Sequence, residues 1–276
     1  MPIIASLSAV PSRFADLQPV LKALLRQDAR LEEVRLYLPK RYRRFPDYDG
    51  SLPTVPKGVR IIQVDEDLGP ASKVLFAARD LKDEDCDIFY CDDDHIYARD
   101  WVSRMIRHRG DRLEHCICTV HETISIDGQP LPQRRLPLPQ SRPTMRLNWL
   151  QRRARRVAGR IKKQRPIWEL TKRTATGGYV DVACGMGGVL VRPAFFDAQF
   201  YEIPSVIWAV DDYWLAGHFA RKNIPIWVAP DFRWPQTLAS SGVDALYLSV
   251  TDGAARAEAN AACVRYMQDT YGIWQP

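Results

Sequence analysis

The stretch Asp87-Ile88-Phe89-Tyr90-Cys91-Asp92-Asp93-Asp94 decides the fold class of this chain. A short apolar run, Ile88 to Cys91, leads directly into three consecutive aspartates. Such a run, bounded by polar residues, is typical of a strand that is buried on both faces of a parallel sheet. We therefore predict a buried strand over residues 87–91, with an acidic triplet, Asp92-Asp93-Asp94, at its carboxyl end.

Strand and helix patterns alternate on the amino-terminal side of this stretch. The sequence predicts strands over 3–7, 34–38 and 59–64, and helices over 14–27 and 70–81. Successive strand–helix units favour an α/β fold with a mostly parallel central sheet and flanking helices. Ligands of such sheets bind beyond the carboxyl ends of the strands. Besides the triplet, the residues that we expect at this edge are Ser8, Arg13, Asp65 and Lys73.

The pattern is looser on the carboxyl-terminal side. A glycine-rich segment, Gly185-Met186-Gly187-Gly188, precedes a short apolar run that ends at Val191. Its glycines permit a close approach of the backbone to a ligand, or form a bulge between strands. The other elements that we predict are short strands within 116–126, a strand over 224–229, and helices over 100–110, 210–222 and 252–271.

The composition is that of a chain with a large core. Its 276 residues, 46% of them hydrophobic, fit one large α/β domain or two small ones. No apolar run is long enough to span a bilayer, and the first residues lack the basic and apolar regions of a signal peptide. The six cysteines include no C-x-x-C pair, which favours a reduced chain. We therefore expect a cytoplasmic protein.

The positive charge is concentrated in one segment. Residues 133–173 contain fourteen Lys or Arg residues and one acid, Glu169, whereas the net charge of the whole chain is +6. The rest of the chain is therefore mildly acidic. Because a nucleic-acid-binding protein more often spreads its basic residues over a folded face, we expect no nucleic-acid partner.

A helical pattern lies inside this basic segment. Its apolar stripe consists of Leu147, Leu150, Ala154, Val157, Ala158 and Ile161, and most residues around it are Arg or Lys. An amphipathic, Arg-rich helix flanked by tryptophans (here Trp149 and Trp168) can lie in a lipid headgroup layer. Three interpretations stay open for residues 145–165: contact with an anionic membrane surface, a solvated helix packed on the domain, or a flap over an active site.

Two acidic features suggest chemistry, and one of them, the triplet, lies at the predicted sheet edge. Three adjacent carboxylates repel one another unless a cation neutralises them, and carboxylates suit Mg²⁺ or Mn²⁺ shared with substrate phosphates. The alternative is a solvated acidic turn. Asp211-Asp212 starts a predicted helix, where the helix dipole alone can explain two acids, or where one of them serves as a general base.

A further segment, Gly69-Pro70-Ala71-Ser72-Lys73, combines a glycine turn, a helix start and a cation. Exposed N–H groups and a cation in the first helical turn favour an anion. The alternative is a Gly-Pro turn of the kind that commonly precedes a helix, without a binding role. With the acidic triplet one strand later, the segment is consistent with a counter-charge for phosphate.

In this order, these features resemble the GT-A-fold nucleotide-sugar glycosyltransferases. Within that fold they are most similar to bacterial family-2-like enzymes that build surface polysaccharides. The resemblance covers roughly residues 2–110 and 177–235, so the basic segment and the last predicted helix lie outside it. It implies a GT-A-like, Rossmann-related fold with a basic helical insertion. The matching segments are Ser8–Arg13, Asp65–Lys73, Tyr90–Asp94, Gly185–Gly188 and Val210–Gly217.

The resemblance implies roles on the donor side. Asp92 and Asp94 match the ligands of a divalent ion, Mn²⁺ or Mg²⁺, with Asp92 also facing the nucleotide and Asp94 bridging to the diphosphate. Asp93 assists either of them. The residues implied to bind the nucleotide donor are Ser8, Arg13, Asp65, Lys73, Asp92 and Asp93.

It also implies roles on the acceptor side. Asp212 matches the catalytic base of inverting members, and Asp211 beside it matches a catalytic-site residue that binds the acceptor or the donor sugar. The residues implied to shape the sugar and acceptor pocket are Gly185, Gly187, Gly188 and Trp214. Many metal-dependent members also supply a histidine ligand late in the chain. Here no histidine follows His218, which we interpret as a surface residue of its helix.

The implied division has four parts. Residues 1–110 form the donor-binding half, 111–132 connecting strands, 133–173 the basic amphipathic insertion, and 174–276 the acceptor-binding and catalytic half.

We therefore predict a metal-dependent, inverting glycosyltransferase. It would move a sugar from a nucleoside-diphosphate donor, with a UDP-sugar favoured, to a hydroxyl of a glycan or lipid-linked acceptor. Under the membrane interpretation, residues 145–165 would bring it to the inner face of the plasma membrane. One alternative is a sugar nucleotidyltransferase, although Ser8–Arg13 lacks the glycine-rich phosphate loop of that class. A non-enzymatic basic RNA- or membrane-binding adaptor would leave both acidic features unexplained.

Overall fold

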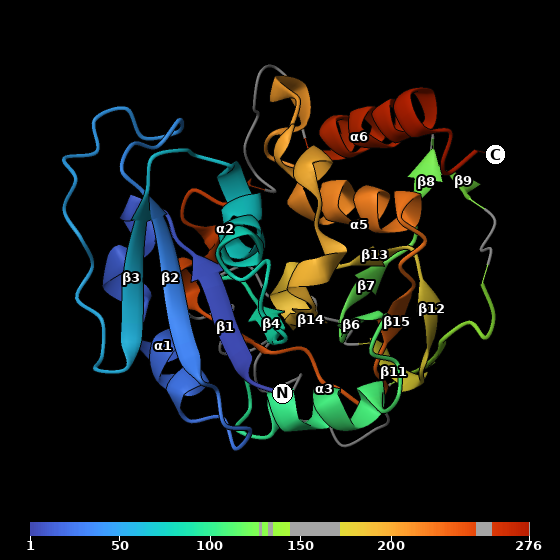
Figure 1. The fold of residues 1–276 in the computed structure, drawn as a ribbon, viewed down its shortest axis with the longest axis horizontal. Helices are drawn as coiled ribbons and strands as arrows, with labels where there is room; N and C mark the ends of the chain where they lie inside the picture. Colours follow the sequence, from blue (N-terminus) through green and yellow to red (C-terminus); the bar gives the residue numbers. More distant parts are fainter. Residues whose placement is uncertain (127–128, 132–134, 144–171, 247–255, 276) are drawn as a thin grey trace, which may run out of the picture.

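An eight-stranded mixed sheet runs through the molecule in the order β12-β15-β6-β14-β4-β1-β2-β3 (Figure 1). The computed structural model describes residues 1–126, 129–131, 135–143, 172–246 and 256–275. Strands β4, β1, β2 and β3 are mutually parallel, as are β6 and β15. The strands of this sheet are β1 Ile3–Ser8, β2 Glu33–Pro39, β3 Val59–Val64, β4 Asp87–Tyr90, β6 Cys116–Cys118, β12 Gly178–Val180, β14 Val189–Val191 and β15 Ile226–Val228.

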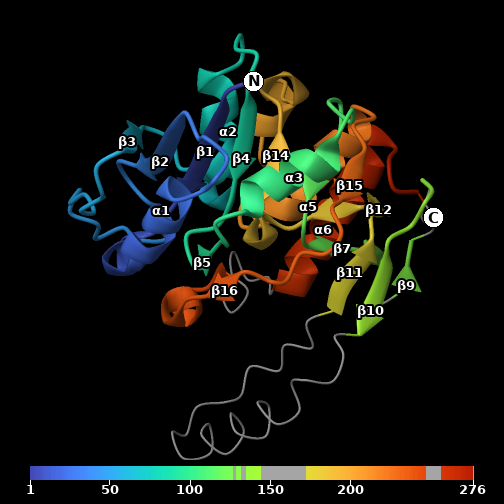
Figure 2. The same ribbon diagram turned by 90° about the horizontal axis from the view of Figure 1, so that it is seen from below.

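Helices cover both faces of the sheet: α1 and α3 pack on one face, and α2, α5 and α6 on the other (Figures 1 and 2). Alternate residues of each strand face opposite sides. In β4, for example, Ile88 and Tyr90 join the core under α2, α5 and α6, whereas Phe89 and Cys91 join the core over α1 and α3. The helices are α1 Gln18–Leu25, α2 Ser72–Asp80, α3 Trp101–Arg109, α5 Asp211–Arg221 and α6 Arg256–Tyr271.

The predicted α/β fold with a mostly parallel sheet is confirmed, and its second half adds antiparallel strands. β14 runs antiparallel to both of its neighbours, β4 and β6, and β12 runs antiparallel to β15. Because β14 lies between strands from the first part of the chain, the two predicted halves contribute to one sheet. Among the described residues, no helix combines the length and the apolar character needed to cross a bilayer.

Short elements surround the sheet. The short 3-10 helices are η1 Pro11–Asp16, η2 Gly69–Ala71, η3 Gly185–Gly187, η4 Pro193–Phe195, η5 Ala198–Tyr201, η6 Ser205–Ile207 and η7 Ala239–Gly242. The short antiparallel pairs are β5 His95–Ile96 with β16 Gln236–Thr237, β7 His121–Glu122 with β13 Val182–Ala183, β8 Ser125–Ile126 with β9 Gln129–Pro130, and β10 Gln140–Pro143 with β11 Lys172–Thr176. The last pair lies in and directly after the basic segment, and the helical pattern predicted within 145–165 lies outside the described residues.

Some predicted elements differ in their bounds. The helix predicted over 14–27 is instead η1 followed by α1, each with a proline in its first turn, where the missing N–H costs little. The helix predicted over 70–81 begins as η2 and continues as α2. The start of the helix predicted over 252–271 lies outside the described residues, and α6 is described from Arg256.

The interpretation of His218 as a surface residue is wrong. Its side chain is completely buried, with ring centroids 4.3 Å from Trp214 and 4.7 Å from Phe200. The reason is tertiary: α6 packs against α5, so the face of α5 that would otherwise meet solvent is covered.

Candidate functional site

A cavity of about 560 Å³ opens beyond the carboxyl ends of β1 and β4, where the parallel part of the sheet meets α5. This is the edge at which α/β sheets bind ligands. The volume is within the range of small-molecule and cofactor sites. Its lining includes Ser8, Arg13, Asp67, Lys73, the triplet Asp92–Asp94, His95, Glu122, Asp211, Asp212, Arg256 and Asn260.

Lys73 lies at the centre of the acidic groups. Its Nζ is 2.6 Å from Oδ1 of Asp92, 2.6 Å from Oδ2 of Asp211 and 3.6 Å from Oδ1 of Asp212. The residue is only 4% exposed. Burial disfavours its ammonium form, but the three carboxylates hold the pKa of Lys73 well above its usual value. Lys73 therefore joins the triplet after β4 to the acidic pair that begins α5.

The pKa values of the two adjacent acids of α5 are shifted in opposite directions. Burial alone would raise the pKa of Asp211, but the charges of Lys73 and Arg256 hold it below its usual value. For Asp212, burial and the neighbouring charge of Asp211 raise the pKa to about 7. The carboxylate of Asp212 also accepts a hydrogen bond from the backbone N–H of Gly185, at 3.0 Å. Asp212 is thus poised to exchange a proton near neutral pH.

The carboxylates of the acidic triplet form ion pairs with basic side chains of the protein. Nη1 of Arg13 lies 2.8 Å from Oδ1 of Asp93 and 3.2 Å from Oδ2 of Asp94, while Lys73 binds Asp92. Burial still raises the pKa of Asp93, to about 6, despite Arg13. The repulsion that we used to infer a metal ion from the sequence is therefore already offset by side chains.

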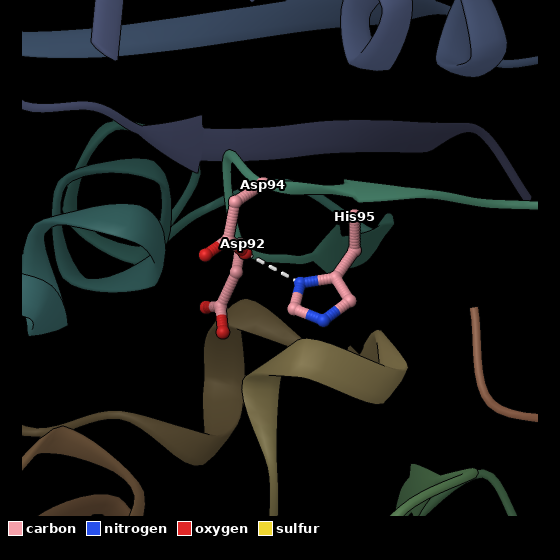
Figure 3. Close-up of side chains that lie close together, drawn as sticks. All are labelled: Asp92, Asp94 and His95. Atoms are coloured by element: carbon pink, nitrogen blue, oxygen red, sulfur yellow. Dashed lines mark ion pairs between the residues drawn. The ribbon is translucent and has the colours of Figure 1, made fainter. Parts of the chain in front are cut away.

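A cluster that could hold a metal ion nevertheless exists beside these cations. One ligand atom from each of Asp92, Asp94 and His95 lies within 4.8 Å of the others (Figure 3). Nδ1 of His95 is 2.5 Å from Oδ1 of Asp94, and although burial disfavours the imidazolium, this carboxylate raises the pKa of His95. Two carboxylates suit Mg²⁺ or Mn²⁺, and an added imidazole nitrogen favours the less oxygen-selective Mn²⁺.

The segment 236–246 closes one side of this cluster. β16 pairs with β5, so Thr237 lies opposite His95, and the N–H of Leu238 donates to the carbonyl of Asp94 at 2.8 Å. Arg13 donates from Nε to the carbonyl of Val243 at 2.9 Å, in addition to its ion pairs. Arg13 therefore connects the triplet to this late segment of the chain.

Gly185 is where the glycine-rich segment meets the acidic groups. A Cβ at this position would lie 2.1 Å from Nζ of Lys73 and 2.9 Å from Oδ1 of Asp92, so a side chain here would displace these groups. Gly187 and Gly188 instead face the protein interior. A Cβ at Gly187 would meet Thr119 and Val120, and one at Gly188 would meet Phe89. In this segment it is Met186 that lines the cavity.

The structure also corrects the expected positions of Asp65 and Trp214. Asp65, expected at the donor site, is an exposed residue whose carboxylate pairs with Lys40 at 2.7 Å, outside the cavity lining. Trp214, expected in the acceptor pocket, is completely buried and donates from Nε1 to the carbonyl of Phe200. Helical geometry explains the second error, because a residue two positions after Asp212 points to nearly the opposite side of α5.

Eight of the expected residues line the cavity, together with others that sequence reasoning missed, whereas Gly185, Gly187 and Gly188 are outside its lining. Ser8, Arg13, Lys73, Asp92, Asp93, Asp94, Asp211 and Asp212 all line it. Among the missed residues, His95 directly follows the triplet, and that adjacency was the available signal. Asp67 accepts hydrogen bonds from the N–H groups of Arg43 and Gly69. Glu122, Arg256 and Asn260 had no local signal, since folding alone brings them to the cavity.

Comparisons with known proteins give structural similarities at low identity. No family model matches the chain, and no curated protein sequence matches it. S. aureus TarS 1–349 in complex with UDP-GlcNAc is 14% identical, with a TM-score of 0.48, over 98% of this chain and 66% of that one. The same protein in complex with UDP is 14% identical, with a TM-score of 0.44, over 87% of this chain and 61% of that one. The chain therefore spans less than two thirds of these TarS structures.

A structure of 4-diphosphocytidyl-2C-methyl-D-erythritol synthase is also similar. It is 13% identical, with a TM-score of 0.43, over 87% of this chain and 94% of that one.

Proposed function

We propose that the chain is a glycosyltransferase that uses a nucleoside-diphosphate sugar as its donor. One observation carries the proposal: two acidic groups far apart in the sequence, Asp92–Asp94 and Asp211-Asp212, face one cavity and share Lys73. A transferase of this kind needs both of them, one near the leaving diphosphate and one near the attacking hydroxyl. A solvated acidic turn would not bring a second acidic pair to a buried lysine.

The donor would occupy the part of the cavity beside the triplet. Asp92, Asp94 and His95 would hold Mn²⁺ or Mg²⁺, which when bound neutralises charge on the leaving diphosphate. Ser8 and Asp67 line the neighbouring part of the cavity, next to the carboxyl ends of β1 and β3, and would face the nucleoside. A UDP-sugar is the first donor to test.

The acceptor would enter from the side formed by the second half of the chain. Glu122, Tyr213 and Asn260 line this side beyond Asp212, and their polar groups suit the hydroxyls of a glycan or of a lipid-linked sugar. Asp212 would take the proton from the attacking hydroxyl. The acceptor oxygen would bond to the anomeric carbon as the bond to the diphosphate breaks, and the diphosphate would leave with the electron pair. Attack opposite the leaving group would invert the anomeric centre.

The test is a donor screen that follows release of free nucleoside diphosphate. Each nucleoside-diphosphate sugar is incubated with Mn²⁺ and a panel of glycoside acceptors, and donor hydrolysis by water is scored as well. We expect release from at least one donor, lost in Asp212→Asn. A nucleotidyltransferase would instead release pyrophosphate from a nucleoside triphosphate and a sugar phosphate. That product, without any turnover of nucleoside-diphosphate sugars, would overturn the proposal.

A further inference from the structure

Lys73 has a different environment from that of a ligand-binding lysine. The sequence suggested that its ammonium meets the donor, but the residue is 4% exposed and its Nζ is within 2.6 Å of two carboxylates. An ammonium has three N–H donors. One of them is donated to Asp92, and Nζ also forms ion pairs with Asp211 at 2.6 Å and with Asp212 at 3.6 Å.

The backbone around Lys73 is shaped to keep the ammonium in this place. The Cα of Gly185 lies so close that a Cβ would come within 2.1 Å of Nζ. The N–H of the same glycine donates to Asp212. Gly185 therefore confines the ammonium on one side and holds the neighbouring carboxylate through its own N–H.

The cations are distributed unequally over the acidic pair of α5. Asp211 has Lys73 at 2.6 Å and Nη2 of Arg256 at 3.7 Å, and it is 4% exposed. Asp212 has Lys73 only at 3.6 Å, and its side chain is 19% exposed toward the cavity. A close cation stabilises the charged form of a carboxylate and makes it a weaker base. The geometry thus gives two adjacent aspartates different base strengths, with Asp212 the stronger base.

We propose that Lys73 is a positioning residue that engages Asp92 and Asp211 and thereby leaves Asp212 as the carboxylate that accepts the acceptor's proton. The proposal rests on the proposed function for the identity of the reaction. Its structural part, the coupling of Lys73 to Asp211, is independent of any substrate. Lys73 acts through the two carboxylates and does not itself touch the donor.

The first test separates this role from that of a donor ligand. Binding of UDP with Mn²⁺ is measured by titration calorimetry, and turnover at saturating donor is measured for wild type, Lys73→Met and a matched control, Lys82→Met, whose side chain is 73% exposed. For Lys73→Met we expect the Kd for UDP to rise less than ~3-fold and kcat to fall ~100-fold, within the usual range of acid–base contributions. A Kd that rises by a larger factor than kcat falls would identify a donor ligand and overturn the proposal.

A second test uses stability alone and needs no active enzyme. Thermal unfolding is compared for Lys73→Met, Asp211→Asn and the double variant. Loss of Lys73 alone leaves the buried carboxylate of Asp211 with only the more distant Arg256, at 3.7 Å, which is destabilising, so removing the charge of Asp211 as well should restore part of the loss. We expect the double variant to melt ~4 °C or more above Lys73→Met. Additive losses in Tm would show that the two residues are uncoupled and would refute the proposal.

Failure of the proposed function and failure of the positioning role of Lys73 give different results. If no nucleoside-diphosphate sugar turns over but the double variant regains stability, the proposed function is wrong and the coupling of Lys73 to Asp211 stands. If turnover is found but UDP binding collapses in Lys73→Met, the function stands and the positioning role is wrong.

Discussion

The N–H of Gly185 donates a hydrogen bond to Oδ1 of Asp212 at 3.0 Å, which ties the glycine-rich segment to the first turn of α5. This bond holds the carboxylate at the cavity wall while its side chain stays 19% exposed. A base needs such an arrangement: a fixed position, and access for the proton it accepts.

Replacement of Asp212 by asparagine should separate binding from chemistry. The amide side chain keeps an oxygen that can accept the N–H of Gly185 but has no basic carboxylate. We expect Asp212→Asn to leave UDP affinity nearly unchanged and to reduce transfer by roughly 10²–10⁴-fold. Calorimetry and nucleoside-diphosphate release measure the two quantities, with Asp269→Asn, an exposed acid of α6, as the control. Normal turnover of Asp212→Asn would exclude this residue as the base.

The activity should depend on pH through Asp212. Burial and the charge of Asp211 raise its pKa to about 7, so below pH 7 the residue is increasingly protonated and cannot accept a proton. We expect kcat to rise from pH 6 to pH 8, with a midpoint near 7. The residual activity of Asp212→Asn should lack this inflection. A profile that falls over the same range would contradict the assignment.

Metal dependence should require His95 as well as the aspartates. The three side chains bring their ligand atoms within 4.8 Å of one another, so loss of one removes a neighbouring ligand. We expect Mn²⁺ to strengthen UDP binding in wild type, and this enhancement to fall ~10-fold or more in Asp94→Ala and in His95→Ala, as ligand-sphere changes usually do. Asp83→Asn, with a side chain that is 85% exposed, serves as the control. Equal enhancement in all variants would exclude this cluster as the metal site.

Buried His218 should make the fold sensitive to mild acid. Burial lowers its pKa to about 3, and its Nδ1 accepts a hydrogen bond from Nε of Arg221. Because the unfolded chain binds this proton near pH 6.5 and the folded chain does not, stability falls as the pH drops below 6.5. The loss by pH 5 is at most about 2 kcal/mol.

Denaturant unfolding at pH 7.5 and pH 5 tests this expectation. His218→Asn retains an acceptor near the position of Nδ1 but does not titrate. Its stability should therefore decrease less between the two pH values than that of wild type. An identical decrease in both proteins would assign the acid sensitivity to other groups.

The basic segment should bind anionic membranes if the first interpretation of residues 145–165 is correct. Each basic residue near an anionic surface contributes about 1 kcal/mol. We expect co-sedimentation with vesicles that contain anionic lipid, none with neutral vesicles, and loss of binding on deletion of residues 145–165. Binding that survives the deletion would rule out this segment as the membrane contact.

Much of the architecture was predictable because the signals are local. The runs at 3–7, 34–38, 59–64 and 87–91 became β1 to β4, since strand patterns are local. Residues 3–7 of β1 and all of β4 are buried, whereas the edge strand β3 keeps Arg60 and Gln63 exposed. The acidic triplet directly follows the fourth of these runs, so it could be placed at the carboxyl end of that strand and thus at the sheet edge. Helix bounds were less predictable around residue 17, where η1 gives way to α1, because prolines permit either start.

The errors arose where a side chain's direction or cover depends on the rest of the fold. Asp65 and Asp67 are nearly adjacent in the loop after β3, yet the turn into η2 directs only Asp67 to the cavity. Trp214 was assigned to the pocket from its closeness in sequence to Asp212, although the helical repeat places the two on different sides of α5. His218 was assigned to the surface because no pattern within α5 indicates that α6 covers it.

By itself, the sequence determined that this chain builds an α/β sheet and that carboxylates follow its fourth strand, because periodicity and strand ends are properties of neighbouring residues. Only the tertiary structure decided which cations those carboxylates meet, Lys73 at Asp92 and Arg13 at Asp93 and Asp94, and that Lys73 also meets Asp211. Charge interactions act through space and depend on burial, so residues 73, 92 and 211 become one electrostatic unit only after the sheet and its helices have packed.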